Sequence, residues 1–214
     1  MESVNPRRYD ASRRRAQALR TRQAIIESAR RRFLSDGYSA TTIASIAEEA
    51  EASPDTIYKS FGGKPGLLRA MCEDALRGGG PVPAEQRSDA MQAAATDPAA
   101  LLRGLGTLTA EIAPRIAPLL LLLTSAAGSD PALTDLHEQL EDARLARMTQ
   151  VAQTVAGKTG LRAGRTAAEA ADIMWTYSSP ELFRLLVLTR GWTPERYGEF
   201  VGESLVAALL DTVS

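Results

Sequence analysis

One predicted helix near the amino end carries polar side chains that could hydrogen bond to an external partner. Ser53 is a favourable N-cap, and Pro54 at the first helical position is followed by an acidic residue where the helix dipole favours an anion. Ile57 and Phe61 lie four residues apart and predict the inward face. Lysine can donate to guanine and aspartate can accept from cytosine, so the opposite face has the chemistry to read base edges. Its residues are Asp55, Thr56, Lys59 and part of Tyr58.

The chain offers little of the chemistry that an active site needs. It has one histidine and one cysteine, and it lacks a phosphate-loop pattern, a dinucleotide fingerprint and clustered metal ligands. We therefore expect no enzyme activity, no catalytic residues, no metal site and no cofactor. His137 stands on a charged stretch and is expected to be exposed or salt-bridged. Cys72 is expected to be a packed thiol, with a redox sensor as the alternative, and a single cysteine excludes an intrachain disulfide.

Two short segments with apolar residues at helical spacing precede the polar helix. The first predicts a helix that ends at Gly37, and the second predicts a helix of about two turns that starts at Thr42. The second helix is separated from the polar one by residues 51–53 only, which is the spacing of a helix-turn-helix. The second helix of such a unit can enter a major groove about 12 Å wide. The residues of the two apolar faces are Ile25, Ile26, Ala29 and Phe33, then Ile43, Ile46, Ala47 and Ala50.

A string of residues at fixed offsets resembles the TetR family of transcriptional regulators. It consists of Thr41, Thr42, Ile46, Ala47, Ala50, Ser53, Thr56, Tyr58, Phe61, Lys64 and Leu67. The resemblance covers about a quarter of the chain, and the remainder is similar only in length and helical character. The chain departs from the family pattern at Glu51, where a glycine commonly sits. A glutamate in a left-handed conformation there could cost roughly 1 to 2 kcal/mol.

The resemblance also implies roles for individual residues. Thr42 and Tyr58 would contact phosphates, and Lys64 would add a charged contact that sets the register without reading bases. Asp55 and Lys59, four residues apart, could instead pair with each other, and Tyr58 could instead be a core aromatic. The implied base readers are Ser53, Pro54, Asp55, Thr56 and Lys59.

Charge is unevenly divided along the chain. Residues 1–78 carry 14 Lys and Arg against 10 Asp and Glu, whereas the rest carries 11 against 16, although the whole chain has a net charge of only −1. A basic front and an acidic back are expected if only the front meets nucleic acid. We expect three parts: a flexible basic arm at 1–20, a helix-turn-helix domain at 21–78, and a helical ligand-binding and dimerisation domain at 79–214. The arm would add sequence-independent attraction to phosphates or remain a solvated tail.

The sequence beyond the Gly/Pro segment at 78–83 is helical in character throughout, so the predicted class is all-α. Ala and Leu dominate, and five to six helices fit between turn signals at 97–98, 113–114, 128–131, 157–164 and 191–194. The apolar run 119–123 is far shorter than the roughly 20 residues that span a bilayer, so it is expected to be core and no membrane is expected as a partner. The amino end lacks a secretory apolar segment, which predicts a cytoplasmic location.

The last two long helices predict self-association. Residues 167–188 are apolar around nearly the whole helix, and the final helix has a second apolar stripe at three-and-four spacing. The family resemblance implies that these helices pair with their symmetry mates in a homodimer, which would read a near-palindromic site. The expected interface residues are Leu182, Leu186, Tyr197, Val201, Leu205 and Leu209.

A ligand pocket is expected beside an interruption of the penultimate helix. Pro180 lacks a backbone donor and biases the preceding residue away from helical geometry. A local opening there would have an aromatic wall made of Trp175, Tyr177 and Phe183, with Met148 facing it. The alternative is that these four are ordinary core and interface residues.

The sequence thus predicts a ligand-responsive transcriptional regulator, a repressor by the commoner habit of the family. It would bind a near-palindromic operator in double-stranded DNA as a homodimer and be released by an unidentified small molecule. The alternative is a helical small-molecule-binding or interaction protein that has lost DNA binding. The reason to consider it is Glu51, which departs from the family pattern in the turn.

Overall fold

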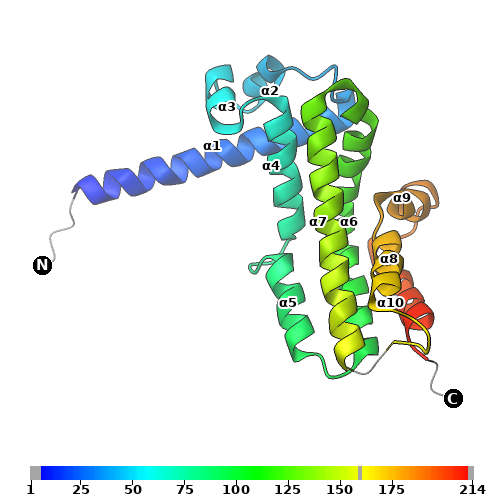
Figure 1. Ribbon diagram of the computed structural model, residues 1–214. Coiled ribbons are helices and arrows are strands. Elements are labelled where there is room, and N and C mark those ends of the chain that lie inside the picture. Colours follow the sequence, from blue (N-terminus) through cyan, green and yellow to red (C-terminus); the bar gives the residue numbers. More distant parts are fainter. Residues whose placement is uncertain (1–5, 159–160, 212–214) are drawn as a thin grey trace, which may run out of the picture. The chain divides into compact units, whose positions relative to one another are not determined.

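The computed structural model describes residues 6–158 and 161–211, and within these ranges all regular elements are helical, which confirms the predicted all-α class (Figure 1). The chain divides into two compact units, residues 1–71 and 72–214. The first holds α1 (Pro6–Asp36), α2 (Ile43–Glu49), α3 (Pro54–Phe61) and the start of α4 (Lys64–Arg77). The second holds the end of α4, α5 (Ala84–Ala94), α6 (Pro98–Ala126), η1 (Ala127–Ser129), α7 (Pro131–Lys158), α8 (Ala167–Tyr177), α9 (Pro180–Phe183), the π-helical η2 (Arg184–Thr189) and α10 (Pro194–Leu209).

The first unit is held together by apolar side chains from all four of its helices. In α1, Ile25, Ala29 and Phe33 recur at helical spacing and are fully buried, as the periodicity predicted. Gly37 has φ +85° and ends α1, because glycine takes this left-handed conformation without steric cost. The core is completed by Ile46 of α2, Ile57 of α3 and Leu67, Leu68 and Met71 of α4.

Helix α1 is longer at its amino end than the sequence pattern suggested. The segment expected to be a flexible arm at 1–20 is helical from Pro6 onward, and its first five residues lie outside the described ranges. Arginine, alanine, glutamine and leucine are good helix formers, and their register continues into the buried face that starts at Ile25. Apart from half-buried Ala16, residues 12–20 are exposed. The basic segment is therefore an exposed helix rather than a disordered arm.

Helices α6 and α10 form the central contact of the second unit. A Cβ atom on Gly106 of α6 would lie 2.3 Å from the Gly198 carbonyl oxygen and 2.8 Å from the Gly202 nitrogen, both in α10. A Cβ on Gly198 would likewise lie 2.5 Å from the Gly106 oxygen. The two backbones thus touch, and only glycine permits so close an approach. The crossing buries the apolar stripe of α10 against its own chain.

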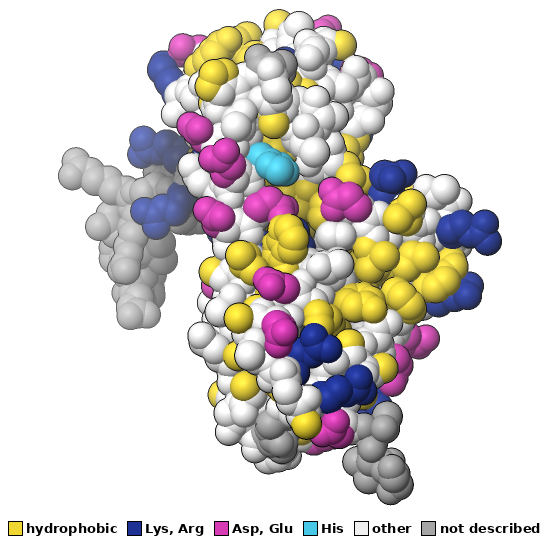
Figure 2. Space-filling view, turned by 45° about the vertical axis from the view of Figure 1, so that its right-hand side comes forward, with side chains coloured by type: hydrophobic (Ala, Val, Ile, Leu, Met, Phe, Trp, Pro, Cys, Tyr) yellow, Lys and Arg dark blue, Asp and Glu magenta, His cyan; other side chains and the backbone are white. Residues whose placement is uncertain are grey.

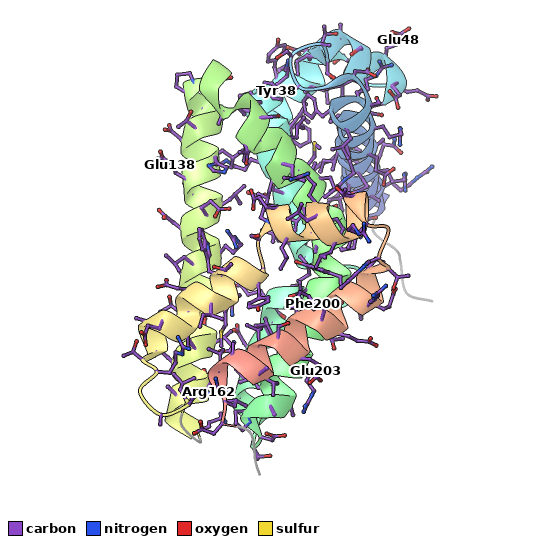
Figure 3. All side chains as sticks on the ribbon, turned by 90° about the vertical axis from the view of Figure 1, so that its right-hand side faces the viewer. Tyr38, Glu48, Glu138, Arg162, Phe200 and Glu203 are labelled. Carbon is purple, nitrogen blue, oxygen red and sulfur yellow. The ribbon has the colours of Figure 1, made fainter. Side chains whose placement is uncertain are left out.

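Two arginines make further contacts between elements of the second unit. Arg147 of α7 forms ion pairs with Glu85 and Asp89 of α5, each 2.5 Å between nitrogen and oxygen. Arg162 lies at the carboxyl end of α10 (Figure 3), where its backbone N–H donates to the Leu209 carbonyl at 2.8 Å. Its guanidinium donates to the carbonyls of Ala207 and Leu210, so it satisfies acceptors that a helix end leaves free.

Two boundaries differ from the expected ones. The turn expected at 113–114 does not exist, because α6 continues through Pro114 and Pro118 for 29 residues. Each proline removes one backbone donor, but burial of Leu119, Leu120 and Leu123 holds the helix in one piece. The Gly/Pro segment at 78–83 is a turn between α4 and α5, whereas the border between the compact units falls inside α4, after Met71.

Helix α6 is the one described helix long and apolar enough to cross a membrane by length and composition. Its most apolar window has a mean hydropathy of 1.3, and 44% of that window is buried inside the protein. Leu119 and Leu123, in the run expected to be core, are fully buried. The same apolar character is therefore typical of a helix at the centre of a helical domain.

Candidate nucleic-acid interface and ligand pocket

Helix α2 begins where a capping box fixes its first turn. The Thr42 hydroxyl accepts from the Ser45 backbone N–H at 3.1 Å, and the Ser45 hydroxyl accepts from the Thr42 N–H at 3.3 Å. The two contacts satisfy donors that a helix start leaves unpaired. Thr42 is the predicted N-cap, and its side chain remains exposed beside the start of α2.

Helix α3 also has its predicted start and end. The Ser53 hydroxyl accepts from the Thr56 N–H at 3.1 Å, Pro54 is the first helical residue, and Gly62 ends the helix in a left-handed conformation with φ +76°. Ile57 is fully buried, which turns the opposite side of α3 to solvent. That outward side carries Asp55, Tyr58 and Lys59, all exposed.

The turn between α2 and α3 contains the left-handed backbone conformation that glycine adopts without steric cost. Glu51 has φ +50° and is the sole described residue other than glycine with a positive φ. The Glu51 N–H donates to the Glu48 carbonyl at 3.2 Å, and the Ala52 N–H donates to the Ala47 carbonyl at 2.9 Å. These bonds hold the turn, so the helix-turn-helix forms with glutamate at this position at a strain of roughly 1 to 2 kcal/mol.

Asp55 and Lys59 pair with each other on the surface of α3. This pairing was one of the two alternatives that the sequence left open. The Lys59 Nζ atom lies 2.6 Å from Asp55 Oδ2, and the two side chains are 76% and 73% exposed. The hydroxyls of Ser53 and Thr56 lie 2.9 Å apart and also bond to each other. The candidate base-reading side chains are therefore partnered locally before any partner molecule arrives.

Lys64 has an internal contact that the sequence did not indicate. Its ammonium donates to the Tyr38 carbonyl oxygen at 2.5 Å and lies 4.3 Å from the centre of the Tyr38 ring. The Tyr38 ring in turn lies 5.3 Å from the ring of Phe33. Lys64 thus ties the start of α4 to the loop after α1. Its position in the family motif gave no sign of this, because Tyr38 lies 26 residues away.

A second contact missed by the sequence analysis fixes α2 on α1. Glu49 lies between Arg31 and Arg32, with oxygen to nitrogen distances of 2.7 and 2.6 Å. The hydrogen bond from Arg31 is the largest of the effects that lower the pKa of the Glu49 carboxyl. The three residues join the outer face of α2 to α1, so the orientation of the helix-turn-helix depends partly on charge.

The second unit holds a pocket of about 360 Å³ between α6, α7, α8 and α9. Of the four residues expected to line it, Trp175 does so, whereas Met148 and Phe183 are buried in the core. Tyr177 is half-buried, with its ring 6.1 Å from that of Phe200. The expected aromatic wall is thus wrong for three of its four residues, because their apolar side chains are used in packing. The pocket is lined by Thr124, His137, Glu141, Arg144, Trp175, Thr176, Ser179 and Glu181.

The expected dimer residues of α10 are also placed differently. Tyr197, Val201, Leu205 and Leu209 are at most 1% exposed and belong to the core of their own chain. Their assignment to a dimer interface is wrong, because the glycine crossing brings α10 directly onto α6. The other two expected residues, Leu182 and Leu186, are partly exposed.

The arrangement of α1 to α4 defines a helix-turn-helix protein, with a capped, outward-facing second helix of the kind that enters a major groove. Residues 25–71 match the family model described as "Bacterial regulatory proteins, tetR family". These residues are therefore a DNA-binding domain of the tetR family, and the predicted family resemblance is confirmed.

Solved structures extend the likeness in fold to most of the chain. A protein from Saccharomonospora viridis in complex with choline is 21% identical, covers 89% of this chain and 98% of its own, and has a TM-score of 0.68. NalD of Pseudomonas aeruginosa, the secondary repressor of the MexAB-OprM multidrug efflux pump, is 20% identical, with coverages of 92% and 100% and a TM-score of 0.69. The SmeT–triclosan complex is 19% identical, with coverages of 89% and 92% and a TM-score of 0.72. None of the curated proteins matches the chain.

Proposed function

We propose that the protein is a ligand-responsive transcriptional regulator that binds a near-palindromic operator as a homodimer and leaves it when a small molecule binds the second unit. The observation that carries the proposal is α3, a short helix capped at both ends whose polar face is exposed while Ile57 is fully buried. A helix presented in this way fits the major groove. The match of residues 25–71 to the tetR family supports the same conclusion.

The DNA contacts follow from the position of each side chain on the helix-turn-helix. Thr42, Tyr58 and Lys64 contact phosphates and set the register of α3 in the groove. Lys59 donates to guanine and Asp55 accepts from cytosine once their mutual ion pair opens. Ser53, Pro54 and Thr56 complete the reading surface at the amino end of α3.

Control by a small molecule is supported by the second unit and by the related structures. The second unit has a pocket of about 360 Å³, large enough for a small organic ligand. Similar structures contain choline or triclosan, and another similar protein is a repressor of an efflux pump. A regulator of this type acts on DNA in the cytoplasm.

The homodimer forms through the apolar surface that follows the break at Pro180. Leu185 and Leu188 of η2 are 48% and 56% exposed, and Phe200 of α10 is 37% exposed. Figure 2 shows hydrophobic side chains gathered on this face, with basic side chains at their edge. Leu182 and Leu186, which the sequence assigned to the interface, lie in the same segment and are only partly covered. Large exposed apolar side chains that gather on one face are typical of a protein–protein interface.

Release of DNA follows from a shift between dimer conformations. Two half-sites lie roughly 34 to 36 Å apart per helical turn, so two α3 helices must be held at that spacing to dock together. A ligand that favours a dimer with a different spacing weakens binding by its differential affinity for the two conformations.

Selection from randomised duplex DNA tests the proposed function. The purified protein should enrich one near-palindromic sequence, and binding should weaken as salt rises because phosphate contacts release counterions. A full-length protein that enriches no sequence, even at low salt, would support the alternative of a helical ligand-binding or interaction protein without DNA binding.

The dimer surface has its own test in sedimentation. Leu188→Glu places a charge in the apolar patch and should shift the protein from dimer to monomer, with at least about a tenfold weaker association. Leu145→Glu is the matched control, because Leu145 is 38% exposed on α7. A Leu188→Glu protein that sediments as the parent dimer contradicts this interface.

A further inference from the structure

We infer that the pocket between α6, α7, α8 and α9 binds a small protonated amine that also carries an oxygen atom able to accept a hydrogen bond. The inference rests on the proposed function only in taking this pocket as the ligand site. It names the chemical class of the ligand, which neither the family match nor the fold determines.

Arg144 shows how the pocket already accommodates a cation of its own. Its guanidinium donates to the Trp175 carbonyl and to Glu141, each at 2.5 Å, and lies 4.5 Å from the centre of the Trp175 ring. A carboxylate, an aromatic face and a backbone carbonyl are the groups that bind amines and guanidinium ions. The charge of Arg144 is thus balanced by Glu141 within the pocket.

Glu181 leaves the pocket with an excess of negative charge. It lines the pocket from α9, and no ion pair or hydrogen bond to its side chain occurs among the described residues. His137 also lines the pocket, and its Nε2 atom lies 3.2 Å from the hydroxyl oxygen of Thr124. Figure 2 shows acidic side chains around the histidine on this face. With Arg144 balanced by Glu141, the remaining charge of Glu181 favours a ligand with one positive charge.

The carboxyl end of α8 also favours a positively charged ligand. Helix α8 ends at Tyr177, so its last carbonyls, including that of Trp175, are at the negative end of the helix dipole and beside the pocket. Arg144 caps one of these carbonyls. A second cation beside the last turn of α8 would lie in the same favourable field.

Two unpartnered donors indicate the acceptor oxygen. Trp175 Nε1 and Arg144 Nε are buried N–H groups without a hydrogen-bond partner within the protein, and both belong to side chains that line the pocket. Buried polar groups are nearly always paired, so these two donors are open to an acceptor from outside the chain. A ligand that carries an acceptor oxygen as well as its ammonium group supplies both parts.

The position of Glu181 links ligand binding to the apolar surface. Glu181 lies four residues before Leu185 in the continuous helical segment formed by α9 and η2. An amine held by Glu181 therefore acts on the segment that carries Leu185 and Leu188. This gives the ligand a short route to the proposed dimer interface.

Calorimetric titration with three probes of similar shape tests the inference. The probes are tyramine, 4-propylphenol and 4-hydroxyphenylacetate, which keep the phenolic oxygen and differ in charge. Tyramine should bind at least about tenfold more tightly than the other two, as expected for an ammonium in direct contact with the exposed Glu181 carboxylate. Glu181→Gln should weaken tyramine about tenfold, whereas Glu199→Gln, an exposed acid on α10, should leave its affinity unchanged.

Each opposite result overturns the inference. Equal binding of the three probes, tighter binding of the anion, or no binding up to about 10 mM would exclude an amine site, and an unchanged affinity of Glu181→Gln would place it elsewhere. Operator selection with the same protein separates the two proposals. Selection without a preference for tyramine removes only the inference, whereas a preference for tyramine without selection removes only the proposed regulator.

Discussion

Lys59 and Asp55 form an ion pair across one turn of α3, with 2.6 Å between Nζ and Oδ2. Both side chains are about three-quarters exposed, so the pair is screened by water and is worth only a few tenths of a kcal/mol. DNA can therefore open the pair at little cost. The pair also keeps the two proposed base-reading groups on one edge of α3 in the free protein.

Replacement of Lys59 tests its proposed reading of guanine. Lys59→Ala should relax the preference at one base position per half-site and should change the free energy of unfolding by less than about 0.5 kcal/mol. The measurement is sequence selection with the variant, compared with the parent under the same salt. If the variant selects the parent motif unchanged, Lys59 does not read a base.

Glu51 offers a stability test of the turn between α2 and α3. Its φ of +50° is the left-handed conformation that a non-glycine residue adopts at a cost, so Glu51→Gly should stabilise the protein by about 1 kcal/mol. Urea unfolding measures the change, and Glu48→Gly, in the last turn of α2, is the control that should destabilise the protein by up to a similar amount. A Glu51→Gly protein less stable than the parent would contradict strain at this position.

The helix-turn-helix could be predicted because its boundaries depend on neighbours in sequence. Thr42, Ser53 and Gly62 each act within three or four residues, through a side-chain cap or a left-handed turn. Local rules of this kind need no knowledge of the rest of the fold. The same rules failed at Pro114, where burial of a long apolar helix outweighed the local preference of proline.

The second unit could be predicted only in outline, because its contacts join distant residues. The apolar stripe of α10 was visible in the sequence, but a stripe does not state whether it packs on its own chain or on a partner. Gly106 and Gly198 decide this, and they lie 92 residues apart. The pocket likewise depends on Arg144 reaching the end of α8, a contact across 31 residues.

The crossing of α6 and α10 predicts a large effect from one methyl group. Gly106→Ala should destabilise the protein by about 3 kcal/mol, because its Cβ would lie 2.3 Å from the Gly198 carbonyl and would force the helices apart. Thermal and urea unfolding measure the loss. Gly128→Ala is the control, since a Cβ there has no atom within 4 Å. Equal stability of the two variants would mean that the helices do not touch at Gly106.

Lys64 should act on stability and on DNA binding at once. Lys64→Ala removes the donor to the Tyr38 carbonyl and should cost about 1 kcal/mol of unfolding free energy. If the ammonium also contacts a phosphate, the variant should bind all sequences more weakly and the salt slope should fall by about one. Affinity measured across a salt series separates the two effects. An unchanged slope with reduced stability would leave Lys64 with its internal role alone.

Glu111 predicts a pH dependence of stability. The hydrogen bond from Arg87, with 2.6 Å between Nη2 and Oε1, is the largest effect on the Glu111 carboxyl, and the pKa of that carboxyl is lowered. The Gly79 N–H, which also donates to Glu111, adds to the lowering. A carboxyl whose pKa is lower in the folded protein stabilises it above the unfolded pKa of about 4.3, and this stabilisation is lost as the pH falls through the folded value.

Glu111→Gln should therefore destabilise the protein by about 1 kcal/mol at pH 7, and the difference from the parent should shrink as the pH is lowered below about 4. Urea unfolding at a series of pH values from 7 to 3 measures the destabilisation at pH 7 and its decrease at low pH. Glu138→Gln, an exposed position on α7, controls for the loss of one negative charge. A difference that stays constant over the whole series would show that the charge of Glu111 does not contribute, and that its hydrogen bonds alone hold Arg87 and Gly79 together.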